Sequence, residues 1–160
     1  IESGLESFVA PRSLRGIGEM AFLGCSSLKH VDLSACRPNF RKDQRTFLST
    51  RVFEDSGLES IVLPRTLSII EARTFYNCKR LRSVTVGAGS KSDSNVAVFI
   101  APPHLQRIGS LAFAGCIALK EFRVNEGVQE LGWLCLWNSG VEKVDIPPHV
   151  RMTPEQLGIG

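Results

Sequence analysis

The chain has 160 residues, of which 43% are hydrophobic and 22% charged; this composition is typical of a folded globular domain and excludes an intrinsically disordered chain. The formal net charge of +3, from 19 basic and 16 acidic residues, is too small to indicate a nucleic-acid or membrane-surface protein by itself. The longest wholly apolar run, residues 96–101, is much shorter than the ~20 residues of a membrane span, so we expect no membrane insertion.

A short motif, Leu-x-x-hydrophobic-x-hydrophobic, recurs six times along the chain. Its copies begin at Leu5, Leu28, Leu58, Leu81, Leu119 and Val141. The starts lie 23, 30, 23, 38 and 22 residues apart, which indicates a unit of about 23 residues with two longer copies. The alternation of apolar and polar residues in each copy predicts a short strand that buries one face.

A second block follows the strand motif in three units. It reads Pro-x-x-Leu-x-x-Ile and ends on Phe-x-x-Cys, with its cysteines at Cys25, Cys78 and Cys116. The proline ends the strand because it cannot donate a hydrogen bond to a sheet, and Leu-x-x-Ile predicts a short second extended segment. The spacing of Phe-x-x-Cys predicts a single helical turn. Stacked units would bury their anchored residues in ladders. We therefore expect a core that includes Leu28, Leu58, Ile70, Phe75, Leu81, Phe113 and Leu119.

At these motifs the chain resembles the BspA-like class of leucine-rich repeats, over about residues 3–150. The resemblance implies a right-handed, β-rich (α/β) superhelical solenoid with one long parallel sheet. It also implies protein binding without catalysis, as in surface-exposed adhesion proteins of bacteria and parasitic protists. We expect one leucine-rich-repeat domain over residues 1–160, with about six coils.

Two units depart from the pattern. The second places Val52 and Asp55 where Phe and Cys are expected, with Phe47 at the position of Ile70. In the fifth, residues 134–138 (Leu-Cys-Leu-Trp-Asn) replace Ala-Phe-x-x-Cys. We expect local distortion of both coils.

The extra residues of the two long units follow the strand motif, near residues 34–43 and 87–101. We interpret them as insertions that emerge on one side of the solenoid. The second opens with a polar, flexible stretch, Gly87-Ala88-Gly89-Ser90-Lys91-Ser92, which lacks the spacing of a phosphate-binding loop. The first is basic, with Arg37, Arg41, Lys42, Arg45 and the nearby Arg51 interleaved with Phe40 and Phe47. An RNA- or anion-binding accessory protein that uses residues 37–51 is therefore the alternative function.

The two ends of the sequence suggest a fragment of a longer array. The chain starts at Ile1 directly before a repeat, without an initiator Met or a signal peptide. It closes on Thr153-Pro154-Glu155-Gln156, which predicts a helix N-terminus with Thr153 as the cap and Pro154 in the first turn.

No residue pattern indicates an enzyme, a cofactor or a metal site. The three histidines, His30, His104 and His149, lie in different units, and no Cys-x-x-Cys, Gly-x-Ser-x-Gly or His-Glu-x-x-His motif is present. His30 and Asp32 share a strand face, where we expect them to be ordinary exposed residues.

The cysteines at the shared repeat position should be buried core residues, whereas Cys36, in the first insertion, should be exposed and reactive. The family resemblance implies a cell-surface or secreted protein. The odd number of cysteines, five, also allows a reducing compartment.

We predict the partner surface from the alternation of side chains across a strand. The third and fifth positions of each strand motif should point away from the core and form two columns. The predicted partner-binding residues in these columns are Ser7, His30, Asp32, Ser60, Val62, Ser83, Thr85, Glu121, Arg123, Lys143 and Asp145, with Val9 beside them. The expected partner is a protein, contacted by an adhesin-like chain or by a subunit of a larger assembly.

Overall fold

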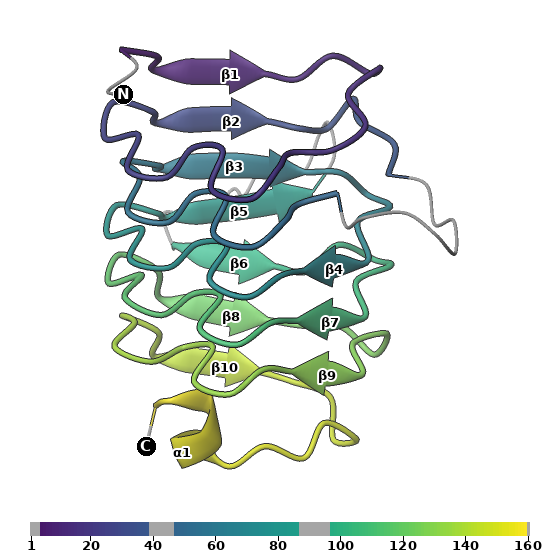
Figure 1. The fold of residues 1–160 in the computed structure, drawn as a ribbon. Helices are drawn as coiled ribbons and strands as arrows, with labels where there is room; N and C mark the ends of the chain where they lie inside the picture. The colour runs from purple at the N-terminus through teal and green to yellow at the C-terminus, as the bar shows by residue number, and fades with distance from the viewer. Residues whose placement is uncertain (1–3, 39–46, 87–96, 160) are drawn as a thin grey trace.

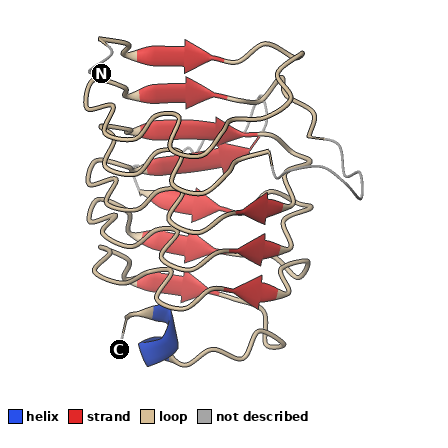
Figure 2. Ribbon diagram, in the orientation of Figure 1, coloured by secondary structure: helices blue, strands red, loops and turns tan. Residues whose placement is uncertain are grey.

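A computed structural model describes residues 4–38, 47–86 and 97–159, which form a ladder of stacked coils (Figure 1). Strands account for most of the regular structure, and the one described helix is a short turn near the C-terminus (Figure 2). The elements are β1 (Ser7–Val9), β2 (His30–Asp32), β3 (Ser60–Leu63), β4 (Ile69–Ile70), β5 (Ser83–Val86), β6 (Val98–Ile100), β7 (Arg107–Ile108), β8 (Glu121–Arg123), β9 (Glu130–Leu131), β10 (Lys143–Asp145) and α1 (Pro154–Leu157).

The long parallel sheet that the repeat predicts is confirmed. Seven strands pair in parallel in the order β1-β2-β3-β5-β6-β8-β10. Equivalent positions of the motif lie side by side, as where Ser60 pairs with Ser83. The predicted second extended segments form a narrower parallel sheet of β4, β7 and β9. In Figure 1 the arrows of this sheet point in the opposite direction to those of the long sheet. In the first two coils an isolated bridge between Ile17 and Leu48 takes their place.

The long sheet has one more strand than the motif has recognised copies. β6 lies within the segment that we interpreted as the second insertion, and it pairs with β5 on one side and β8 on the other. Its Phe99 stands beside Val84 and Phe122, as a core position of the motif should. This copy is hard to recognise in the sequence because its motif starts on Val96 rather than on leucine. Val96 also follows Leu81 by fewer residues than a full unit contains.

The core is a continuous stack of side chains between the two sheets and the turns. Phe22, Phe53, Phe75 and Phe113 stack ring on ring, with centroid distances of 5.5, 5.7 and 5.1 Å between successive rings. All seven residues expected in the core are fully buried, which confirms the predicted ladders. At the N-terminal end Phe8, Leu14 and Phe22 are only partly buried, because the described residues include no coil that covers this side of them.

The predicted register of the second coil is wrong by one residue. Leu48 pairs with Ile17, so Leu48 and not Phe47 takes the position of Ile70. Phe53 therefore fills the place assigned to Val52, and its ring stacks on Phe22 and Phe75. The adjacent apolar pairs 47–48 and 52–53 fit the motif in either frame, and packing against the neighbouring rings selects one.

Neither of the two divergent coils is distorted. Two left-handed residues bend the second coil as they bend the third: Arg51 and Asp55 have φ values of 58°, close to the 57° and 60° of Arg73 and Asn77. In the last coil Leu136 replaces the phenylalanine and is fully buried. The ladder continues there, because Phe113 N donates to Cys135 O at 2.9 Å.

Helix α1 covers part of the C-terminal end of the core. Thr153 caps it as predicted: its side chain accepts from Gln156 N, while the Gln156 side chain accepts from Thr153 N. Leu157 is buried, and Leu136 N donates to its carbonyl at 2.9 Å. With four residues, α1 is far too short to cross a membrane, and the described residues contain no longer apolar helix.

Candidate functional site

The register of the long sheet places the predicted partner-binding residues in two columns. The third-position column contains Ser7, His30, Ser60, Ser83, Val98, Glu121 and Lys143. The fifth-position column contains Val9, Asp32, Val62, Thr85, Ile100, Arg123 and Asp145. Val98 and Ile100 were missed together with β6.

The N-terminal part of this face brings a serine and a histidine together. His30 in β2 and Ser60 in the neighbouring β3 stand side by side, and His30 Nδ1 lies 2.7 Å from Ser60 Oγ. Asp32 accepts a hydrogen bond from Ser34 N at 2.9 Å, and no described hydrogen bond joins it to His30. The pair therefore lacks the carboxylate that orients the imidazole in a catalytic triad. Among the described residues this arrangement is a polar contact on the surface of the sheet.

The middle of the face is less accessible than predicted. Thr85 and Glu121 are each only 8% exposed, and Val98 is 4% exposed. Thr85 is a small side chain inside the sheet, with Val62 directly beside it. Glu121 is covered by the long side chains of Arg123 and Lys143, which share its face. These two residues are therefore not open contact positions.

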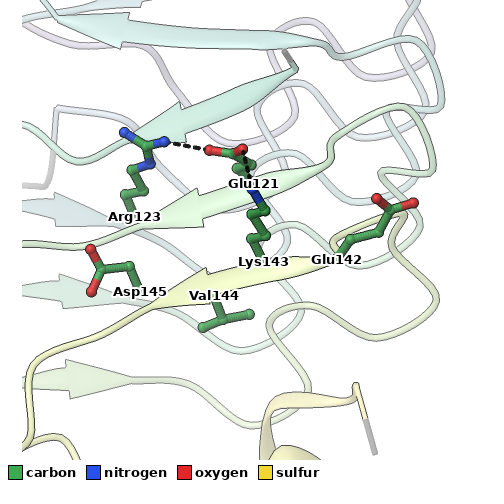
Figure 3. A pocket seen from close by; sticks show the side chains of 6 residues that line it. All are labelled: Glu121, Arg123, Glu142, Lys143, Val144 and Asp145. Atoms are coloured by element: carbon green, nitrogen blue, oxygen red, sulfur yellow. Dashed lines mark hydrogen bonds and ion pairs between the residues drawn. The ribbon is translucent and has the colours of Figure 1, made fainter.

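Charged residues gather at the C-terminal end of the face, around a shallow hollow of about 550 Å³. We call Glu121, Arg123, Glu142, Lys143 and Asp145 the charged site (Figure 3). The carboxylate of Glu121 lies 2.6 Å from Arg123 Nη2 and 3.8 Å from Lys143 Nζ. Figure 3 shows both cationic side chains reaching toward this carboxylate from β8 and β10.

The cations of the charged site remain accessible although both contact Glu121. The side chains of Arg123 and Lys143 are 57% and 79% exposed, whereas that of Glu121 is 10% exposed. A guanidinium has five N–H donors and an ammonium has three, so one shared carboxylate leaves donors available. The site can therefore accept further carboxylate or carbonyl oxygens from outside.

The basic segment of the alternative function lies mostly outside the described residues: Arg41, Lys42, Arg45 and Phe40 fall there. Arg37 is exposed. The Arg51 guanidinium is 3.6 Å from the Glu54 carboxylate, and Arg73 pairs with the same carboxylate at 2.7 Å. Arg51 is thus part of an ion-pair network between coils.

The prediction that Cys36 is exposed and reactive is wrong. Its side chain is buried, with Sγ 3.5 Å from Pro11 O, because the chain turns back onto the first coil at this point. Burial, with a smaller contribution from the nearby Asp32 carboxylate, raises the pKa of the thiol. A raised pKa leaves less of the reactive thiolate at neutral pH.

The buried cysteines of the repeat position are confirmed. The thiols of Cys78 and Cys116 are free and donate to the carbonyls of Phe53 and Phe75 in the preceding coil, at 3.0 and 3.1 Å. Burial raises the pKa of Cys78 to about 12. Within the described ranges, no group of three or more His, Cys, Asp and Glu side chains is placed to hold a metal ion.

The chain matches the family model of the BspA type leucine rich repeat region in six copies, over residues 2–89 and 87–157. It therefore belongs to the BspA-type leucine-rich repeat family. No curated protein matches the sequence.

Solved structures share the fold at low sequence identity. A leucine-rich repeat protein from Bacteroides ovatus aligns with a TM-score of 0.64 at 19% identity, over 91% of this chain and 38% of its own. The pneumococcal vaccine antigen PcpA aligns at 0.58 and 20% identity, over 90% and 41%. A leucine rich cell surface protein from Faecalibacterium prausnitzii aligns at 0.50 and 17% identity, over 91% and 42%. The chain thus spans about two fifths of the length of these proteins.

Proposed function

We propose that this chain is a protein–protein interaction module that contacts its partner through the face of the long sheet. The observation that carries the proposal is the charged site. Its two exposed cations stand on neighbouring strands, and the shielded Glu121 carboxylate holds both of them. Because the strand backbones fix these positions, little conformational entropy is lost when a partner binds.

The chemistry of the face describes the partner. Arg123 and Lys143 suit carboxylates, while Glu142 and Asp145 suit donors, so a protein surface with mixed charges fits better than a uniformly charged polymer. Charges at the rim of an interface mainly set association rate and register. In β3 and β5, near the middle of the long sheet, the small side chains of Ser60 and Ser83 let a partner approach the backbone closely. We propose no catalytic activity.

We infer a place at a cell surface or outside the cell, as an adhesin-like protein or a subunit of a larger assembly. In support, one solved structure of the same fold is described as a cell surface protein and another as a vaccine antigen. Both are less than 25% identical to this chain, so they support the proposal only through the shared fold.

Affinity capture from the source organism, with quantitative mass spectrometry, tests the contact surface. Reversing both cations, Arg123→Glu with Lys143→Glu, should lower partner recovery at least about tenfold, since like charges then face each other. The matched control, Arg12→Glu with Arg15→Glu, makes the same charge change at two exposed arginines of the first coil and should leave recovery unchanged.

The same capture separates this proposal from binding by the basic segment. Deletion of residues 37–42 should leave recovery intact, and recovery should not depend on added RNA. If the deletion abolishes recovery while the charge reversals do not, the sheet face is not the contact surface.

A further inference from the structure

Both tryptophans of the chain are exposed and lie four residues apart on the turn that follows β9, outside the long sheet. Trp133 and Trp137 are 62% and 47% exposed, and the exposed Leu134 stands between them. Leu134 N donates to Gln156 O at 2.7 Å, and Gly158 packs against the Trp137 backbone. We call Trp133, Leu134, Trp137 and the exposed Ile159 the tryptophan patch. Large aromatic side chains exposed to water are typical of a contact surface.

The patch lies in an acidic part of an otherwise basic chain. Residues 124–141 contain two glutamates and neither lysine nor arginine, whereas the whole chain has a net charge of +3. Glu130 lies in β9, three residues before Trp133. Glu155 directly precedes Gln156, whose backbone carbonyl accepts a hydrogen bond from Leu134 N. Both glutamates are exposed. Arg107 stands beside Glu130 in the narrow sheet but pairs with Glu71 at 3.4 Å. The two exposed glutamates therefore favour a cationic ligand here, although the net charge of the chain opposes it.

The third coil shows which cationic group fits at these positions. Backbone hydrogen bonds between successive coils place Arg73 and Leu134 at the same position of the repeat, and Tyr76 and Trp137 at another shared position. The Arg73 guanidinium lies 4.0 Å from the centre of the Tyr76 ring, and its Nη2 is 2.7 Å from Glu54 Oε1. Arginine is thus held between an aromatic ring and a carboxylate. In the last coil a leucine replaces this arginine, so the face of Trp137 has no cation from its own coil.

We propose that the tryptophan patch binds an arginine-bearing basic segment of a partner protein. The guanidinium stacks on a tryptophan ring, as Arg73 does on Tyr76, and pairs with Glu130 or Glu155. These glutamates take over the pairing, because Ala114 stands in the coil before Trp137 where Glu54 stands in the coil before Tyr76. Tryptophan is the strongest aromatic partner of a cation, and arginine both stacks and pairs, which lysine does less well. This surface is separate from the charged site, and neither depends on the other.

Titration with short peptides tests the proposal, and the chain carries its own reporter. Because Trp133 and Trp137 are its only tryptophans, intrinsic fluorescence reports on this patch alone. An (Arg-Gly)₅ peptide should change the emission with a saturable curve and bind more tightly than (Lys-Gly)₅. An acidic (Glu-Gly)₅ peptide should produce no change.

Anisotropy of fluorescein-labelled (Arg-Gly)₅ then identifies the residues. Trp133→Ser and Trp137→Ser should each weaken binding at least about tenfold, as loss of a central aromatic anchor does. The control Leu23→Ser changes an exposed apolar residue at the turn position of the first coil that corresponds to Trp137. It should bind as wild type does.

Charge-neutral variants test the electrostatic part. Glu130→Gln with Glu155→Gln should weaken binding about threefold or more and reduce its salt dependence. Glu6→Gln with Glu19→Gln, which removes the same charge from the first coil, should change neither. The proposal is overturned if either tryptophan variant binds the peptide as wild type does, or if (Glu-Gly)₅ binds equally well. It is also overturned if sedimentation shows that the patch instead joins two copies of this chain.

Discussion

The phenylalanine rings on the turn side contact one another from coil to coil, so each interior ring is packed on both sides. Phe75 lies between Phe53 and Phe113 at 5.7 and 5.1 Å. Truncation leaves a cavity that the rigid ladder cannot close. Phe75→Ala or Phe113→Ala should lower the free energy of unfolding in urea by about 3–5 kcal/mol. Phe8→Ala, in the partly covered first coil, should cost clearly less. Equal losses for all three would contradict the ring stack.

The buried thiols predict a loss of stability in alkaline solution. Burial raises the pKa of Cys78 and of Cys135 to about 12, from an ordinary value of 9.0. Above pH 9 the unfolded chain loses these protons while the folded chain keeps them. The stabilisation is therefore complete below pH 9 and falls as pH rises toward 12, by up to about 1.4 kcal/mol per pH unit for each thiol.

Urea unfolding at pH 7, 9 and 10, with a reductant present, measures this slope. Cys78→Ala removes one of the buried thiols with a raised pKa, so its stability should decline less steeply between pH 9 and 10 than that of wild type. Parallel curves for the two proteins would show that Cys78 does not carry a raised pKa.

At single residues the sequence predicted the core well and solvent exposure poorly. Phe75 and Phe113 share one repeat position and Leu119 holds another, and stacking the units buries both positions. Cys36, Thr85 and Glu121 were expected to be exposed and are buried. Part of their cover comes from other coils, as Pro11 contributes for Cys36 and Lys143 for Glu121, and a pattern within one repeat does not predict such contacts.

At the scale of the element, the close approach of successive coils decides which residues fit. A Cβ atom on Gly109 would lie 2.4 Å from Ala72 N, in the backbone of the coil before it. Gly18 holds the same repeat position in the first coil, where a Cβ would meet nothing within 4 Å.

Gly109→Ala should therefore lower the thermal unfolding midpoint by several degrees, because the coils would have to separate. Gly18→Ala should have little effect or raise the midpoint slightly, because alanine reduces the conformational freedom of the unfolded chain. If the two variants unfold alike, the coils do not stack as closely as described.

Two elements escaped prediction for the same reason: repeat motifs tolerate substitution at their anchors. The motif that contains β6 starts on Val96, and its distance from Leu81 is shorter than one repeat, so the pattern indicates an insertion there instead of a strand. In the second coil, Phe47-Leu48 and Val52-Phe53 satisfy the pattern in two frames. The frame is chosen by ring stacking of Phe53 with Phe22 and Phe75, which is a long-range contact.

At the scale of the whole molecule, stacking turns a small repeat into two distinct surfaces. The long sheet presents a face of polar and apolar side chains that ends in the charged site, and the turns present the tryptophan patch. The sequence predicted the columns of the sheet face, because alternation along a strand and register between repeats determine them. The tryptophan patch was not predicted, because exposed aromatic residues have no periodic signal in a core motif.

Site-specific photo-crosslinking to the captured partner tests the central claim, contact through the sheet face, most directly. A photoreactive residue is placed at Asp145, on the exposed edge of the charged site, or at Arg12 in the first coil. The account predicts a cross-linked product with the partner from position 145 and none from position 12. A partner that still binds but cross-links from position 12 and not from position 145 would contradict it.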